Sequence, residues 1–260
     1  MYRVQLYRSV VFLLGLAIVS GVIGATPEAN AAFVMTLDDV NTSGVDVIVV
    51  DNTDGSIGTS TSAGYSNKYD LSSIDGIVRY SGSVGNFSVQ ITTALSKPFV
   101  GNPALARIDV TNVSVTASAA GQLAIGVTDT GFLLTGQELG SSIQLTNILG
   151  GTTDGSVNSI GYLGGNNQEF EIGSLSTGAI GSSAPGSFSG TSSKVGDSPA
   201  EAFALSEFIS VTHTGAGQIT TFTKRLEAAV VSVPEPSATV ALSLALLGIA
   251  GYYHWDRKRS

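Results

Sequence analysis

Hydrophobic and polar residues alternate through most of the chain. In residues 86–92, the hydrophobic side chains of Phe87, Val89 and Ile91 share one face, and the polar residues between them share the other. A period of two is typical of a half-buried β-strand. Alternation, or runs of β-branched residues bounded by turn residues, predicts strands at 45–50, 74–80, 86–92, 105–116, 122–127, 143–149, 156–163, 168–172, 205–214 and 218–229.

One predicted strand changes its alternation part-way. Ile108 and Val110 are two residues apart, so their side chains lie on the same face of a strand. Val113 and Val115 have the opposite parity, so in a regular strand they would face the other side. One extra residue at 111–112 would return all four side chains to the same face, and the sequence therefore predicts a β-bulge there.

The segment 173–199 is rich in Gly, Ser and Ala and has few side chains to bury. It is compatible with a long surface loop or with a loose pair of edge strands. Residues 198–201 are also compatible with a short helix. Many short strands with Gly- and Ser-rich turns predict an all-β fold, an antiparallel, jelly-roll-like β-sandwich. A β-helix is the alternative, but it requires a short repeat that the chain lacks.

The N-terminus has the pattern of a secretory signal peptide. Arg3 and Arg8 precede a hydrophobic stretch at 10–23, and the small residues Ala29 and Ala31 form a cleavage site. An uncleaved signal anchor is the alternative. The predicted organisation is a signal peptide at 1–31, a β-sandwich domain at 32–232 and a C-terminal segment at 233–260.

The C-terminal segment combines a proline-containing turn, a hydrophobic run and a basic end. It begins with Val233, Pro234, Glu235, Pro236 and Ser237. Two prolines two residues apart keep the backbone extended and accessible. The run at 238–253 has no charged residue and approaches the length of a transmembrane helix. It is followed by the basic residues Arg257, Lys258 and Arg259, which are typical of the side that stays in the cytoplasm.

This order of Pro-Glu-Pro turn, apolar helix and basic end resembles the PEP-CTERM sorting signal of Gram-negative bacteria. The resemblance covers residues 233–260, and Lys258 departs slightly from the all-Arg version of that basic end. It implies that an exosortase recognises the triplet and removes the tail. It also implies a transient stay in the inner membrane, followed by transfer to the cell surface or to extracellular matrix with exopolysaccharide. A membrane anchor that is never cut is the alternative.

Composition excludes several classes of protein. The chain has 20 acidic and 12 basic residues and a net charge of −8. Several of the basic residues lie in the two terminal segments, so the domain between them is more acidic still. Such a domain has no electrostatic footprint for nucleic acid. The chain has no cysteine, which excludes disulfides, thiol catalysis and thiolate metal sites.

The sequence shows no catalytic constellation, and we expect no enzyme activity. His213 is the only histidine outside the C-terminal tail, and its place at a strand end predicts an ordinary surface or edge residue. The chain has no G-x-S-x-G or H-E-x-x-H motif. Glu169 and Glu171 are candidates for the pair of carboxylates that a glycosidase uses in catalysis. They are equally explained as solvated neighbours on one face of the strand predicted at 168–172.

An acid-rich segment near the N-terminus is a candidate for structural calcium, although no cofactor or catalytic metal is expected. Its acidic residues are Asp38, Asp39, Asp46, Asp51 and Asp54. Their spacing does not match the calcium-binding loop D-x-[DN]-x-[DN]-G. Asp and Gly are also common in turns without any metal.

The predicted ends and the hydroxyl-rich β-domain together favour an exported, non-enzymatic envelope or matrix protein. Its expected role is structural or adhesive, in contact with exopolysaccharide. A carbohydrate-binding module is the second hypothesis, with an aromatic stacking platform built from Tyr65, Tyr69, Tyr80 or Tyr162. An envelope hydrolase is the third, and it would depend on His213 or on a specific acid.

Overall fold

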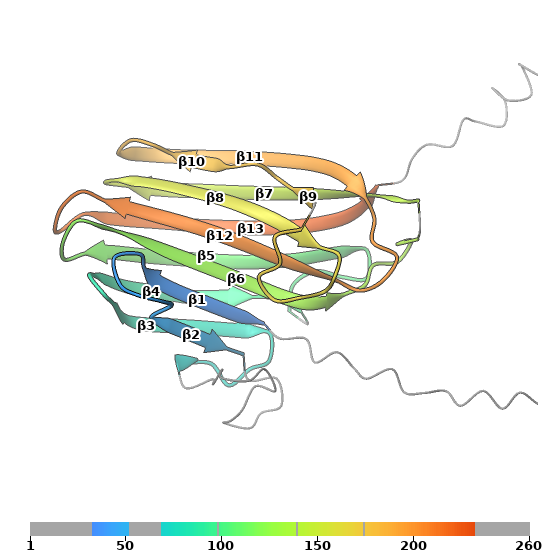
Figure 1. The fold of residues 1–260 in the computed structure, drawn as a ribbon, viewed down its shortest axis with the longest axis horizontal. Helices are drawn as coiled ribbons and strands as arrows, with labels where there is room; N and C mark the ends of the chain where they lie inside the picture. The colour runs from blue at the N-terminus through green and yellow to red at the C-terminus, as the bar shows by residue number, and fades with distance from the viewer. Residues whose placement is uncertain (1–32, 52–68, 98, 139, 174, 232–260) are drawn as a thin grey trace, which may run out of the picture.

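The structure is a computed structural model that describes residues 33–51, 69–97, 99–138, 140–173 and 175–231. These residues form an all-β fold of two antiparallel sheets packed face to face (Figure 1). The strands are β1 Val34–Asp39, β2 Val47–Val50, β3 Ile77–Val84, β4 Phe87–Leu95, β5 Leu105–Ala117, β6 Gly121–Phe132, β7 Ser142–Thr153, β8 Ser156–Gly164, β9 Leu175–Ser176, β10 Ile180–Ser182, β11 Gly186–Asp197, β12 Phe203–His213 and β13 Ile219–Val231.

The two sheets have matching orders. Sheet I runs β10-β8-β12-β6-β1-β2, with β9 added beside β8, and sheet II runs β11-β7-β13-β5-β4-β3. Consecutive strands β5 and β6, β7 and β8, and β12 and β13 lie in opposite sheets. The turns at 118–120, 154–155 and 214–218 make these crossings, and they lie together at the left end in Figure 1. The predicted sandwich is therefore present, and its jelly-roll connectivity stays a prediction.

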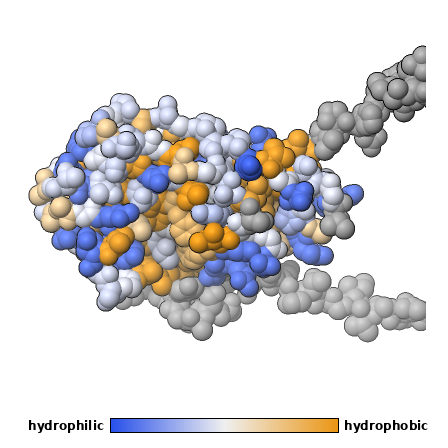
Figure 2. Space-filling model, turned by 45° about the horizontal axis from the view of Figure 1, so that its top comes forward, coloured by the Kyte–Doolittle hydropathy of each residue, from blue (hydrophilic) through white to orange (hydrophobic). Residues whose placement is uncertain are grey.

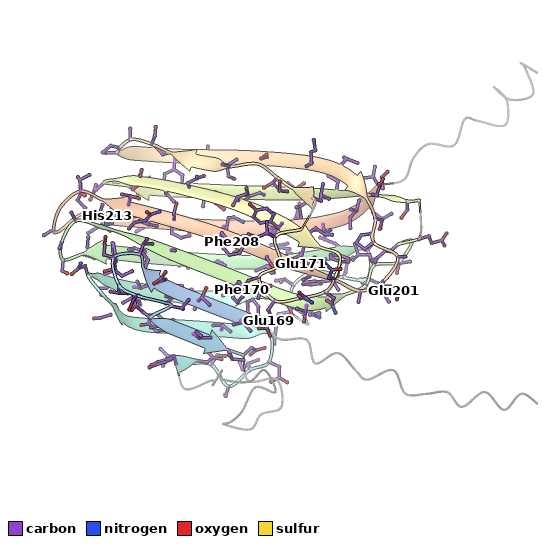
Figure 3. The ribbon with its side chains drawn as sticks, viewed as in Figure 1. Glu169, Phe170, Glu171, Glu201, Phe208 and His213 are labelled. Carbon is purple, nitrogen blue, oxygen red and sulfur yellow. The ribbon has the colours of Figure 1, made fainter. Side chains whose placement is uncertain are left out.

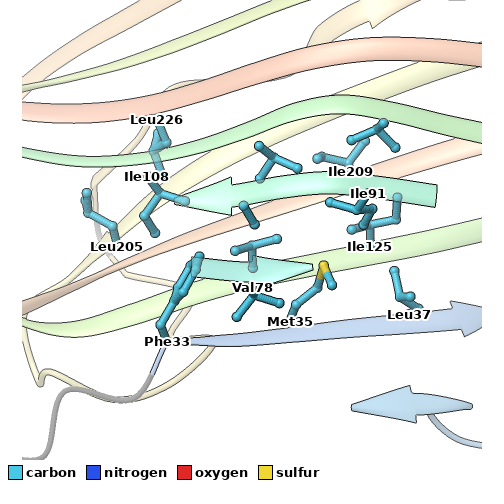
Figure 4. Close-up of a cluster of buried hydrophobic side chains, with 14 of the residues drawn as sticks. Phe33, Met35, Leu37, Val78, Ile91, Ile108, Ile125, Leu205, Ile209 and Leu226 are labelled. Carbon is cyan, nitrogen blue, oxygen red and sulfur yellow. The ribbon is translucent and has the colours of Figure 1, made fainter. Parts of the chain in front are cut away.

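The core consists of the inward-facing side chains of both sheets (Figure 4). It includes Phe33, Met35 and Leu37 from sheet I and Ile91 and Ile108 from sheet II, all with 2 % or less of their surface exposed. Along most of β4 and most of β13, every second residue is buried. Burial of these side chains is the main favourable term in folding. The chain has no cysteine, so no disulfide adds to it.

The predicted bulge in β5 is confirmed. Val113 lies opposite Phe222 of β13, whereas Val110 lies opposite Lys224. Three steps on β5 therefore match two steps on β13, and Asn112 has a positive φ of 52°. The extra residue restores the parity, so that the hydrophobic side chains before and after the bulge all lie in the core.

Several strand boundaries differ from the prediction. β6 continues through the expected stop at 129–131, where β12 still pairs with it after its pairing with β1 has ended. β7 continues through Gly150 and Gly151 because it is paired there on two sides. β1 has no counterpart among the predicted strands. Within 173–199 the edge-strand alternative is right, since β11 pairs with β7 along twelve residues. Residues 198–202 are not helical, and the strand predicted at 168–172 is absent.

The predictions for the two ends fall outside the described residues. This applies to the signal cleavage site at Ala29 and Ala31, to the sorting motif at 233–237 and to the basic end. It also applies to Tyr65 and Asp54. Within the described part of the chain, no helix is long and apolar enough to cross a membrane.

Candidate functional site

A shallow groove of about 280 Å³ lies on the outer face of sheet I. Two neighbouring rows of side chains line it, each running across four strands. The first row is Thr36, Gly126, Phe208 and Ile160, and the second is Asp38, Ala124, Ser210 and Asn158. In the tilted view of Figure 2, hydrophobic side chains gather near the middle of the visible face, with hydrophilic side chains around them.

The floor of the groove is β6, because this strand presents only small residues there. At Gly126, an added Cβ would lie 2.6 Å from Thr36 Oγ1 and 3.1 Å from the ring of Phe170. Any other residue at this position would therefore displace a wall of the groove. Ala124 is the next outward residue of β6, so the floor stays low along the strand. The walls rise from β1 on one side and from β12 on the other.

Phe208 lines the groove, and two further aromatic rings pack against it. The centroids of Phe208 and Tyr162 are 5.9 Å apart in an edge-to-face arrangement, and those of Phe208 and Phe170 are 6.2 Å apart. Figure 3 shows Phe170 and Phe208 near each other over the centre of the sheet. All three are half-buried. Such ring contacts hold the three side chains in place and leave apolar surface beside the polar side chains of the groove.

The loop at 165–173 fixes Phe170 over the sheet. The backbone N–H of Phe170 donates to Thr128 Oγ1 at 3.1 Å, and Gly131 N–H donates to Asn167 Oδ1 at 2.6 Å. Glu171 turns back and accepts hydrogen bonds from Asn166 at 2.8–3.2 Å. Glu169 and Glu171 therefore do not share a strand face, contrary to the prediction, because the segment is a tight loop.

Among the described residues, Asp38 is the only ionisable one that lines the groove. Its Oδ1 is buried and has no hydrogen-bond partner among the described residues. Burial raises the pKa of its carboxyl, and the nearby carboxylates of Asp46 and Asp39 raise it further. Asp38 thus places one carboxylate among the described residues that line the groove.

Comparisons with known proteins give no family for this chain. No family model matches it, and no curated protein matches it. Among solved structures it is similar to the enzymatically active domain of bacteriophage CBA120 tailspike protein 4, at 14 % identity and a TM-score of 0.27 over 56 % of this chain and 19 % of that one. These values carry no argument about function.

Two further solved structures are similar to this chain, with identities and TM-scores as low as these. The carbohydrate-binding module TmCBM61, solved with β-1,4-galactotriose, has 8 % identity and a TM-score of 0.26, covering 54 % of this chain and 86 % of the module. The adhesin domain of Epf from Streptococcus pyogenes has 14 % identity and a TM-score of 0.30, covering 62 % and 61 %. The function of this chain therefore has to be inferred from the chemistry of the groove.

The predicted tyrosine platform is wrong at Tyr80, and its member Tyr65 lies outside the described residues. Tyr80 is 5 % exposed, and its hydroxyl bonds to the carbonyl of Ser83 at 3.3 Å. Tyr69 lies just before β3 in sheet II. Only Tyr162 belongs to the aromatic group, and Phe170 and Phe208 were missed. The sequence does contain a signal for Phe208, since it lies among polar residues on the parity opposite to Ile209.

His213 is a core residue, so the prediction of a surface or edge histidine is wrong. It is 1 % exposed, and its Nε2 lies 2.8 Å from Thr220 Oγ1. Thr220 Oγ1 in turn lies 2.6 Å from Thr153 Oγ1. No carboxylate of the described residues hydrogen-bonds to the ring, which packs against Phe87 instead. This arrangement ties β12, β13 and β7 together across the two sheets.

We expect the stability of the protein to fall on acidification because of His213. Burial lowers the pKa of its imidazole below the value of about 6.5 for an unfolded chain. Its contribution is therefore complete above about pH 6.5 and is lost as the pH falls towards the folded-state pKa. The loss has a limiting slope of about 1.4 kcal/mol per pH unit. Chemical unfolding at pH 7.5 and 5.0 measures it.

The matched variant is His213→Gln, which keeps a polar group near Thr220 but does not titrate. The buried carboxyls titrate in both proteins, so the difference between the two pH profiles isolates the imidazole. Equal pH dependence in the two proteins would contradict the assignment.

Three of the acidic residues near the N-terminus, Asp39, Asp46 and Asp51, have structural partners. Asp39 accepts hydrogen bonds from the backbone of Asn86 and Asn41, and Asp46 accepts one from the backbone of Asp39. Asp51 accepts one from Gly76 N–H at 2.6 Å. Among the described residues, no group of three or more His, Asp or Glu side chains could hold a metal ion. Structural calcium stays a prediction.

Proposed function

We propose that this protein is an exported, non-enzymatic surface or matrix protein that binds polysaccharide in the groove of sheet I. The observation that carries the proposal is an aromatic group around Phe208 beside the polar side chains in the groove, which are Thr36, Asp38, Ser210 and Asn158. Sugar rings have apolar faces that pack on aromatic side chains and hydroxyls that bond to Ser, Thr, Asn and Asp. A shallow groove along a strand fits a section of a chain, and binding there would give the protein an adhesive role.

Phe208 occupies the centre of the groove wall, so its loss is the direct test. We expect Phe208→Ala to weaken binding to a retained polysaccharide at least tenfold, which corresponds to about 1.4 kcal/mol. Affinity electrophoresis or calorimetry with a panel of purified polysaccharides measures this. Phe99→Ala is the matched control, because Phe99 is 53 % exposed and does not line the groove.

Two results would contradict the proposal. One is a wild-type domain that binds no polysaccharide in the panel. The other is equal loss of binding in the Phe208 and Phe99 variants, since that would indicate a general effect of removing an aromatic side chain.

The export part of the proposal rests on the sequence of the two ends. We propose that an exosortase cuts at or near Pro234-Glu235-Pro236, after a transient stay in the inner membrane, and that the mature protein reaches the cell surface or the matrix. The last described strand, β13, ends at Val231. Cleavage at the triplet would therefore remove no described strand and would leave the groove intact.

Changing both Pro234 and Pro236 to Ala should leave the full-length protein in the inner membrane. The intact mass and the cell fraction of the protein measure this outcome. Normal release of the double variant would show that the sorting proposal is wrong.

A further inference from the structure

The basic residues of the domain are distributed unevenly between the two sheets. In the described part of the chain, every Lys and Arg lies in sheet II or in the loop after β4. They are Arg79, Lys97, Arg107, Lys194, Lys224 and Arg225. Sheet I has no Lys or Arg in any of its described strands, although it contains Asp38, Asp39, Asp129 and Glu207.

Four of these basic residues form ion pairs with acidic residues: Lys97, Arg107, Lys224 and Arg225. Lys97 bonds to Asp129 at 3.0 Å. Arg225 bonds to Asp109 at 3.1 Å, and Arg107 bonds to the same carboxylate. None of these groups lines the groove. A ligand in the groove therefore meets one ionisable group, Asp38, and no cation from the groove-lining residues.

We infer that the groove selects neutral polysaccharide chains over anionic ones, and that Asp38 sets this selectivity. The inference rests on the proposed function and names the class of its ligand. The occupant is a section of an uncharged, hydroxyl-rich glycan, such as a hexose polymer without uronate, sulfate or pyruvate groups.

Two physical effects act in the same direction at Asp38. An ionised carboxylate accepts hydrogen bonds but donates none, so it matches sugar hydroxyls and not a second carboxylate. Hydrogen bonds to a charged acceptor are also stronger than those between neutral groups. Asp38 lines the groove, so its carboxylate supplies such an acceptor to a ligand there.

Repulsion excludes the anionic chain. Two like charges a few ångströms apart repel each other most strongly where water is partly excluded. Thr36, Ser210 and Asn158 offer hydroxyl and amide groups but no positive charge to offset this repulsion. The raised pKa of Asp38 agrees with a site in which further negative charge is unfavourable.

The test compares one polymer in two charge states. The probe is the neutral polysaccharide of the panel that binds most tightly, for example a β-1,4-galactan, and the same polymer oxidised to uronate at C6. Affinities are measured at pH 7.5 in low salt. We expect the wild-type domain to bind the neutral polymer at least tenfold more tightly than its oxidised form.

Variants assign the effect to one side chain. Asp38→Asn keeps the shape but not the charge, and we expect it to reduce the ratio of the two affinities to less than threefold. Asp197→Asn is the control, because Asp197 is an exposed acid at the end of β11 in sheet II, and it should keep the wild-type ratio. Thermal unfolding of each variant establishes that it is folded.

The outcomes separate this inference from the function on which it rests. If the wild type binds both polymers equally, or the oxidised one more tightly, polysaccharide binding stands and the charge selectivity is wrong. If Asp38→Asn keeps the wild-type ratio, Asp38 does not set the selectivity. If no polymer binds, both the proposed function and this inference fail.

Discussion

Lys224→Met is expected to destabilise the domain by about 3–5 kcal/mol, the range found when one partner of a buried ion pair is removed. Lys224 of β13 and Glu207 of β12 lie in opposite sheets, and both side chains are 0 % exposed. Their Nζ and Oε2 atoms are 2.6 Å apart. Without the lysine, Glu207 would remain in the core with no cation. The unfolding free energy in urea measures the effect.

The pair itself adds little to stability. Burial lowers the pKa of Lys224 and raises that of Glu207, and in both cases it outweighs the attraction of the partner. Glu207 Oε1 also lacks a hydrogen-bond partner among the described residues. Replacing a buried ion pair by apolar residues of similar size is often neutral or stabilising by about 1–4 kcal/mol.

The double variant Lys224→Met with Glu207→Met therefore provides the control. We expect it to recover most of the stability lost in the single variant, which gives a large coupling energy in a double-mutant cycle. Additive losses from the two changes would contradict this account of the pair.

Gly151→Ala is expected to destabilise the domain by about 3 kcal/mol or more, at or above the usual upper range for overpacking. An added Cβ at Gly151 would lie 2.0 Å from the carbonyl oxygen of Thr221 and 2.8 Å from the Cα of Phe222. Both atoms belong to the backbone of β13, so no side chain can move aside. The neighbouring inner strands β7 and β13 of sheet II would have to separate.

The neighbouring glycine is a matched control. At Gly150 an added Cβ would have no heavy atom closer than 3.7 Å, which is ordinary contact. Gly150→Ala also reduces the freedom of the unfolded chain, so we expect a change between zero and a gain of about 1 kcal/mol. Thermal and urea unfolding measure both variants. Similar losses in the two would show that the strands separate easily, contrary to this account.

Much of the fold is predictable from the sequence because alternation reports directly which side chains face the core. The bulge in β5 illustrates this, since Val110 and Val113 can both face the core only if the strand between them holds one extra residue. Strand ends are less predictable. The turn residues at 129–131 predict a stop, but Lys97 and Ser96 bind the carboxylate of Asp129 and β6 continues past it. Such pairing depends on contacts between distant parts of the chain.

The groove was not predictable in the same way, because its parts come from β1, β6, β8, β12 and the loop at 165–173. The need for glycine at position 126 depends on Thr36 and Phe170, because an added Cβ there would lie too close to both side chains. The aromatic hypothesis relied on tyrosine and found only Tyr162. The alternation along β12 predicts that Phe208 lies on the outer face. Its position beside Tyr162 depends on the register between β12 and β8, which only the structure gives.

The most direct test of the central proposal maps a bound neutral oligosaccharide onto the isotope-labelled domain by backbone chemical shifts. Binding in the groove predicts the largest shifts at the amides of Ala124, Gly126, Phe208 and Ser210, with sheet II unaffected. Shifts confined to sheet II or to the loops at the ends of the strands would contradict the proposal. Saturable binding with that second pattern would place the ligand elsewhere on the sandwich.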